Sequence, residues 1–260
     1  MIDTHCHLTY KPLYDRIEAV LRAADEAGVD RMISVGTCPD DAQRAVALAE
    51  TYSHVYATAG VHPHYAAKWM EGDRLERMLG RLLDHPRVVA MGEMGLDRHY
   101  DDPPLEVQRS VLRRQLDLAG QIRETMPIVI HNREATDEVL AELRRSKLAP
   151  RRFVFHCFTG NSEELAAILQ FGAMVSFTGI VTFGNSRQLS QDAATVPIDR
   201  IMVETDSPYL TPEPHRKHRP NEPCFVPFVA EHLASQRGMK ADIFVAKVDA
   251  NAERFFGLEA

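Results

Sequence analysis

Short apolar segments, many rich in β-branched residues, alternate with longer amphipathic stretches along most of the chain. This alternation restricts the fold more than any other feature, because strands that alternate with helices are typical of a parallel β-sheet. The segments that we interpret as strands are Met1–His5, Arg31–Gly36, Val55–Val61, Val88–Glu93, Ile128–His131, Phe153–His156, Ala173–Phe177 and Ile201–Glu204.

The stretches between these segments have helical periodicity. In the first of them, Ile17, Val20, Leu21 and Ala24 recur at the spacing of one helix face. Ser162, which is followed by two glutamates, predicts a helix with a serine N-cap. The predicted helices are Asp15–Ala27, Pro39–Thr51, Gly72–Asp84, Leu105–Arg123, Ala135–Arg145, Ser162–Gln170 and Asn185–Ala194, with two more near Pro227–Arg237 and Ala241–Phe255.

Eight strands in 260 residues predict a single domain over residues 1–260, folded as a slightly distorted (β/α)8 TIM barrel with extra C-terminal helices. A closed barrel leaves no edge strand. An open doubly wound sheet is the alternative, but no glycine-rich phosphate-binding segment follows the first predicted strand. The proline-rich segment Pro208–Pro223 is predicted to be a stiff loop over the C-terminal face of the barrel.

Composition narrows the class of protein. No apolar stretch approaches the roughly 20 residues of a membrane helix, and the first residues lack the pattern of a secretory signal. The four cysteines are scattered, with no CxxC pair. These features predict a cytoplasmic protein with reduced thiols and no membrane partner.

The charge pattern bears on nucleic-acid binding. A net charge of −7 disfavours non-specific coating of nucleic acid. The basic segment His215–Arg219 is nevertheless compatible with a nucleic-acid substrate, and a solvated loop is its alternative interpretation. At 7% aromatic residues, the composition gives little indication of an extended platform for stacked bases.

Residues of metal-ligand types lie at the ends of five predicted strands. The carboxyl ends of barrel strands converge at one mouth, so these residues are expected to form one cluster. His5 and His7 are two residues apart on an extended chain, so they point to the same face. The candidate ligands are His5, His7, Glu93, His131, His156 and Asp206.

Four histidines and two carboxylates exceed what one tetrahedral ion needs. They match two divalent ions that share a bridging carboxylate, for which Glu93 is the candidate. Zn, Mg, Mn and Ni all fit such ligands. Each residue alone has a structural alternative: His131 and His156 could be hydrogen-bonded core histidines, and Asp206 could begin a turn. Their common position relative to successive strands favours the metal site.

Six motifs follow one another along the chain: His5-Cys6-His7, Gly60–His64, Gly92–Asp97, His131–Arg133, His156–Gly160 and Glu204–Leu210. In this order they resemble the TatD family of metal-dependent deoxyribonucleases, within the amidohydrolase-like barrels. Pro214–Arg216 followed by Asn221–Pro223 resembles the family's loop after the eighth strand. The resemblance covers nearly the whole chain.

The resemblance implies roles for individual residues. His5, His7, Glu93 and Asp206 would hold one ion, and Glu93, His131 and His156 would hold the other. Asp206 would act as the general base toward the attacking water, so that Asp206 and Glu93 are the candidate catalytic residues.

Further residues are candidates for contacts with the substrate. By similarity, His62 would contact the substrate or its phosphate, and Arg133 would bind a phosphate. Glu204 would orient a ligand through a hydrogen bond. Arg216 and Lys217 would add positive charge beside the metals. Arg98 and His99 stand where aromatic residues are usual in the family, and Lys217–Pro220 departs from the usual glycine-containing loop.

The resemblance implies a metal-dependent hydrolase of ester bonds, in the first place a deoxyribonuclease working 3′ to 5′ on single-stranded or frayed DNA ends. An amidohydrolase or lactonase acting on a small cyclic amide or ester is the alternative, because similar barrels with an N-terminal HxH carry that activity. Many of those enzymes use a carboxylated lysine after the fourth strand, and Val88–Asp97 contains none. A metal-bound scaffold without activity is the third hypothesis.

Overall fold

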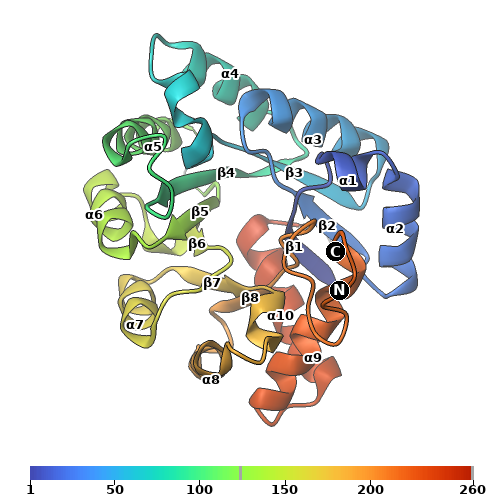
Figure 1. Cartoon of the computed structure of the whole chain (residues 1–260). Coiled ribbons are helices and arrows are strands. Elements are labelled where there is room, and N and C mark those ends of the chain that lie inside the picture. The colour runs from blue at the N-terminus through green and yellow to red at the C-terminus, as the bar shows by residue number, and fades with distance from the viewer. Residues whose placement is uncertain (123–124, 259–260) are drawn as a thin grey trace.

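The computed structural model describes residues 1–122 and 125–258. Its eight strands form one parallel sheet in chain order. The first and last strands meet where His7 N donates to Ser207 O (2.8 Å) and Asp206 N donates to His5 O (2.9 Å). The predicted (β/α)8 barrel is thereby confirmed (Figure 1). The strands are β1 (Ile2–Cys6), β2 (Arg31–Ser34), β3 (Val55–Ala59), β4 (Val88–Asp97), β5 (Ile128–Arg133), β6 (Phe153–Phe155), β7 (Met174–Phe177) and β8 (Ile201–Val203).

Helices surround the strands (Figure 1). They are α1 (Lys11–Tyr14), α2 (Ile17–Glu26), α3 (Pro39–Thr51), α4 (Arg74–Leu83), α5 (Leu105–Ala119), α6 (Thr136–Ser146), α7 (Ser162–Phe171), α8 (Arg187–Thr195), α9 (Val226–Gln236) and α10 (Ala241–Phe256), with 3-10 turns η1 (Pro63–Trp69), η2 (Pro150–Arg152), η3 (Gly179–Thr182) and η4 (Pro223–Phe225). Each predicted helix is present. Arg123, the predicted end of the helix from Leu105, lies outside the described residues, as do the last two residues of the predicted domain.

The start of α7 differs from the prediction. Asn161, not Ser162, is the N-cap: its side chain accepts from the backbone N–H groups of Glu163 (2.9 Å) and Glu164 (3.0 Å). The Glu164 carboxylate accepts in return from Asn161 N (2.9 Å), which completes a capping box. Ser162 is the first helical residue, and its hydroxyl donates to Asp192 (2.8 Å). The prediction was wrong because the asparagine one position earlier satisfies two free amides at once.

Strand alternation explains why the site residues lie inside the barrel. In β5, Ile128 and Ile130 belong to the core between strands and helices, whereas Val129 belongs to the core inside the barrel. His131 lies two residues beyond Val129 and therefore faces the interior as well. His156 follows Val154 of β6 in the same way. The interior core also contains Phe256 of α10.

β4 is longer than predicted, so that Glu93 lies within the strand and not at its end. The extension pairs residue by residue with the end of β5, up to Asp97 opposite Arg133. Gly95 permits this pairing, because a Cβ atom there would lie 1.8 Å from His131 O. The extension places Asp97 next to the histidine of the neighbouring strand.

Among the described residues, no helix is both long enough and apolar enough to cross a membrane.

Candidate metal centre

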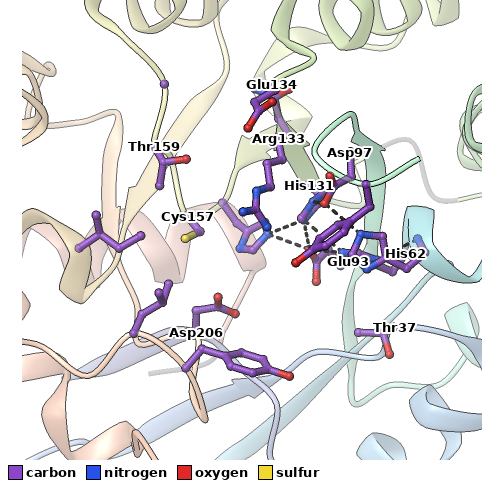
Figure 2. A pocket seen from close by; sticks show the side chains of 18 of the residues that line it. Thr37, His62, Glu93, Asp97, His131, Arg133, Glu134, Cys157, Thr159 and Asp206 are labelled. Carbon is purple, nitrogen blue, oxygen red and sulfur yellow. Dashed lines mark hydrogen bonds and ion pairs between the residues drawn. The ribbon is translucent and has the colours of Figure 1, made fainter. Parts of the chain in front are cut away.

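A cavity of about 1620 Å³ opens at the carboxyl ends of the strands. Five of the predicted ligands line it: His7, Glu93, His131, His156 and Asp206. The sixth, His5, is fully buried and stacks on the His156 ring, with ring centroids 3.9 Å apart. The fold therefore brings all six predicted residues together from five separate segments of the chain, and Figure 2 shows three of them, Glu93, His131 and Asp206.

Glu93 lies at the centre of the cluster, where the dashed lines of Figure 2 converge. Its Oε1 is 2.7 Å from His131 Nδ1 and 2.8 Å from His156 Nε2. Its Oε2 faces the other way, toward His5 Nε2 at 3.5 Å. The two oxygens of one buried carboxylate thus face two different sets of imidazole nitrogens.

Asp206 completes the second set from the segment after β8. Its Oδ1 is 3.2 Å from His7 Nε2 and 3.7 Å from His5 Nε2. In Figure 2 its carboxylate lies across the cavity from Glu93. Asp206 has a φ of +51°, a left-handed conformation that aspartate and asparagine adopt more readily than most residues.

The buried nitrogens fit a cation. Within the described part of the chain, neither ring nitrogen of His5 has a hydrogen-bond partner, and neither does His7 Nδ1. Buried polar atoms usually have hydrogen-bond partners, so these unpaired nitrogens are available to bind a metal ion. Three overlapping sets of ligand atoms each lie within 4.8 Å of one another: His5, His7 and Asp206; His5, Glu93 and His156; His62, Glu93 and His131. Imidazoles and carboxylates in such sets suit Zn and other divalent ions.

The electrostatics of the cluster also favour a cation. Burial opposes charge on His156, but the nearby carboxylates of Glu93 and Glu204 raise the pKa of His156 well above its usual value. Burial likewise opposes charge on Glu93, yet His156 and His62 hold the pKa of Glu93 well below its usual range. Glu93 is therefore ionised, and the negative potential that attracts protons to His156 would also attract a divalent ion.

Two further carboxylates face His131 and His156 at the ring nitrogen that points away from Glu93. Asp97 Oδ2 is 3.1 Å from His131 Nε2, on the ring edge opposite Glu93. Glu204 Oε1 accepts from Cys157 N (2.7 Å) and faces His156 Nδ1 at 3.4 Å. A carboxylate on the far nitrogen leaves the near nitrogen free to bind a metal. Glu204 was expected to orient a ligand, whereas no role was predicted for Asp97, which lies beyond the predicted end of its strand at Glu93.

The hydrogen bonding of His62 distinguishes it from the candidate ligand histidines. His64 N donates to His62 Nδ1 (3.1 Å), and burial lowers the pKa of His62 well below its usual value. A neutral ring that accepts at Nδ1 carries its proton on Nε2. His62 Nε2 faces Glu93 Oε1 at 3.5 Å, so this tautomer makes it a hydrogen-bond donor at the edge of the cluster.

The predicted substrate contacts are divided between two places. Arg133 lines the cavity, and Figure 2 shows its side chain extending from the end of β5 toward the cluster. Among the described residues, the Arg133 guanidinium has no ion-pair partner, because the nearby acids Glu138 and Glu134 pair with Arg98 (2.6 Å) and His99 (3.0 Å). Arg216 and Lys217 do not line this cavity and lie in a separate depression.

Replacing Asp97 with asparagine is expected to weaken metal binding by about 10- to 100-fold, because the amide is a poorer acceptor for the His131 proton. Competition with a chelating dye measures this affinity. Asp101→Asn, which changes a cavity-lining carboxylate outside the cluster, is the matched control and should bind metal like the parent protein. An unchanged affinity together with a lower melting temperature would instead make Asp97 a purely structural residue.

Comparisons with known proteins agree with this geometry. The family model described as TatD related DNase matches residues 2–257. An uncharacterized metal-dependent hydrolase of Bacillus subtilis is 36% identical over 256 residues, or 98% of each chain. A Pantoea ananatis protein named as a 3′-5′ ssDNA/RNA exonuclease is 37% identical and covers 99% of this chain and 100% of its own. A TatD homologue from Escherichia coli has a solved structure with a TM-score of 0.91 at 31% identity, covering 100% of this chain and 98% of its own.

A more distant solved structure bears on the alternative function. A lactonase from Listeria monocytogenes has a TM-score of 0.69 at 15% identity and covers 98% of this chain and 94% of its own. At this identity the likeness extends to the fold alone.

Proposed function

Because the chain belongs to the TatD-related family of metal-dependent hydrolases, we propose that it is an exonuclease that shortens single-stranded or frayed DNA from the 3′ end. One observation carries the proposal: the two oxygens of Glu93 face different sets of histidines on the floor of an open cavity. This arrangement is what two ions sharing one carboxylate require.

We assign the ligands to two ions: His131 and His156 face one oxygen of Glu93, whereas His5 faces the other oxygen and, with His7, faces Asp206. His5, His7, Glu93 and Asp206 would hold one ion, and Glu93, His131 and His156 the other. When bound, the ions would supply an activated water and neutralise charge on the phosphate. Glu93 contacts His131 and His156 through Oε1 and faces His5 through Oε2, so it also fixes the relative position of the two halves of the cluster.

Asp206 would handle the proton of the attacking water. Burial alone would raise its pKa, but the hydrogen bond to His7 and the charges of His7 and His5 lower the pKa of Asp206, so its carboxylate is ionised. Its backbone is fixed by the bond from Asp206 N to His5 O. An ionised carboxylate with a fixed backbone can orient the water and accept its proton.

His62 and Arg133 would bind the scissile phosphate. His62 Nε2 is a donor at the edge of the cluster, and Arg133 supplies a guanidinium that no acid neutralises among the described residues. Guanidinium groups match phosphate oxygens with two parallel hydrogen bonds. These two side chains approach the cluster from β3 and β5, on the same side of the barrel.

Arg216 and Lys217 would act on nucleic acid outside the cavity, because they line a separate depression with His215 and His218. The double replacement Arg216→Ala and Lys217→Ala is expected to lower the slope of log Kd against log salt concentration by about 1 for single-stranded DNA. Fluorescence anisotropy at several salt concentrations measures the slope. Arg133→Ala, a change inside the cavity, should raise the KM for single-stranded DNA more than the double replacement does. Identical slopes for the parent and the double variant would exclude a role for this loop.

The proposal is tested by hydrolysis of a single-stranded oligonucleotide after loading with Zn, Mn, Mg or Ni, with the label at the 5′ end so that it remains on the shortened products. Stepwise shortening that Asp206→Asn abolishes is the expected result. A panel of lactones and cyclic amides is assayed in parallel. Turnover of one of these with no shortening of DNA or RNA would show that the fold and metal centre serve a different substrate.

A further inference from the structure

The cavity is much larger than the metal cluster, and tyrosines make up part of its wall. Four of the seven tyrosines of the chain line it: Tyr10, Tyr65, Tyr100 and Tyr209. Tyr100 and Tyr209 are 50% and 52% exposed, unusually high values for large side chains of this protein. The low aromatic content therefore understates how many rings the fold gathers at this one place.

Tyr209 is an exposed ring on a fixed backbone. Its N–H donates to Asp206 O (3.0 Å), and its carbonyl accepts from the side chain of the fully buried Asn221. The Tyr209 ring meets Tyr10 nearly edge to face, with centroids 6.4 Å apart, and Tyr10 in turn stacks on His7 at 4.6 Å. Tyr209 is thus held three residues beyond Asp206, with about half of its surface open.

Tyr100 occupies the other side of the cluster. Its ring is perpendicular to the rings of His64 (5.1 Å between centroids) and His99 (4.9 Å), and the Arg133 guanidinium lies over its face, 5.4 Å from the centroid. Tyr100 follows β4, whereas Tyr209 follows β8. Strands four apart in an eight-stranded barrel lie opposite one another, so Tyr100 and Tyr209 lie on opposite sides of the cavity that contains the cluster.

We propose that Tyr100 and Tyr209 are stacking platforms for the two bases that flank the scissile phosphate. The proposal rests on the exonuclease function proposed above and names how its substrate is held. The face of an aromatic ring is electronegative and repels phosphate, but it stacks with any nucleobase. The two exposed rings therefore bind bases, while Arg133 and the cluster between the rings bind the phosphate.

This arrangement explains why the substrate would be single-stranded. Two successive bases that stack on separate tyrosines cannot also stack on each other or pair with a second strand. Binding through ring faces tolerates every base, because each base has a flat π-face. The structure thus assigns sequence tolerance and strand selectivity to the same two side chains.

The test combines tyrosine variants with single abasic residues in a 5′-labelled oligonucleotide. Tyr209→Leu and Tyr100→Leu are each expected to lower kcat/KM by about 5- to 100-fold on ordinary single-stranded DNA. When the base that stacks on a tyrosine is absent, the leucine variant of that tyrosine should no longer lower kcat/KM. The terminal base should have this effect for one tyrosine and the penultimate base for the other. Tyr209→Phe and Tyr100→Phe retain the ring and should retain the dependence of kcat/KM on each base. Tyr14→Leu, which changes an exposed tyrosine outside the cavity, is the control and should leave kcat/KM unchanged.

A second readout does not depend on turnover. A cleavage-resistant oligonucleotide carrying 2-aminopurine at either position should lose fluorescence on binding to the metal-loaded protein, and the matching leucine variant should restore it. Equal losses of kcat/KM with and without each base, or quenching that neither variant relieves, would overturn the proposal. If the parent protein shortens no oligonucleotide, the exonuclease function itself fails, which is a different outcome.

Discussion

Glu93→Ala is expected to reduce the metal content of the protein from two divalent ions to at most one and to lower hydrolysis by at least about a thousandfold. The reason is that both oxygens of this carboxylate face candidate ligands: Oε1 faces His131 and His156, and Oε2 faces His5. No other carboxylate of the cluster faces both sets. Elemental analysis of the purified, metal-loaded protein measures the content, and hydrolysis of the labelled oligonucleotide measures the activity.

Two matched variants separate ligation from packing. Glu93→Gln preserves the shape of the buried side chain but replaces an anionic ligand with an amide, so it should lose metal as Glu93→Ala does. Glu134→Gln changes a cavity-lining carboxylate whose partner is His99, away from the cluster, and should retain both ions. Two tightly held ions in Glu93→Ala would remove Glu93 from the role of bridge.

Asp206→Asn is expected to lower kcat by about 10²- to 10⁴-fold while changing the Kd for single-stranded DNA by less than about threefold. An amide cannot take a proton from water at neutral pH, whereas its size and its preference for left-handed backbone suit the φ of +51°. The bond from Asp206 N to His5 O does not involve the side chain and should persist.

The measurements for this variant are single-turnover hydrolysis and anisotropy at saturating metal, since Asp206 is also a candidate ligand. Asp101→Asn, on the cavity wall, is the control and should retain full activity. If Asp206→Asn weakened DNA binding as much as it slowed turnover, Asp206 would be a binding residue and another group would have to accept the proton.

The fold was predictable because its signals are local and repeated. Each buried strand carries its own apolar run, and each helix its own periodicity, so the alternation predicted a parallel sheet. The chain length and the lack of a glycine-rich segment after the first strand then favoured a closed barrel over an open sheet. The features that were missed depend on contacts between segments. The extension of β4 to Asp97 depends on pairing with β5, and the N-cap of α7 depends on which of two neighbouring polar residues reaches the free amides.

The six candidate ligands could be proposed for a related reason: they lie at or near the ends of the predicted strands, and strand ends converge in a barrel. The contacts that support these ligands could not be predicted from the sequence. The position of Asp97 behind His131, and the tautomer of His62 set by His64 N, follow from distances that no sequence pattern encodes. Arg216 and Lys217 were expected beside the metals because phosphodiester substrates need cations there and their loop was predicted to lie over the C-terminal face, but they line a separate depression.

The most direct test of the account is the anomalous scattering of crystals loaded with Mn or Zn. The account predicts two peaks on opposite sides of the Glu93 carboxylate, one beside His5, His7 and Asp206 and the other beside His131 and His156. A single peak away from Glu93, or no peak among these residues at saturating metal, would contradict it.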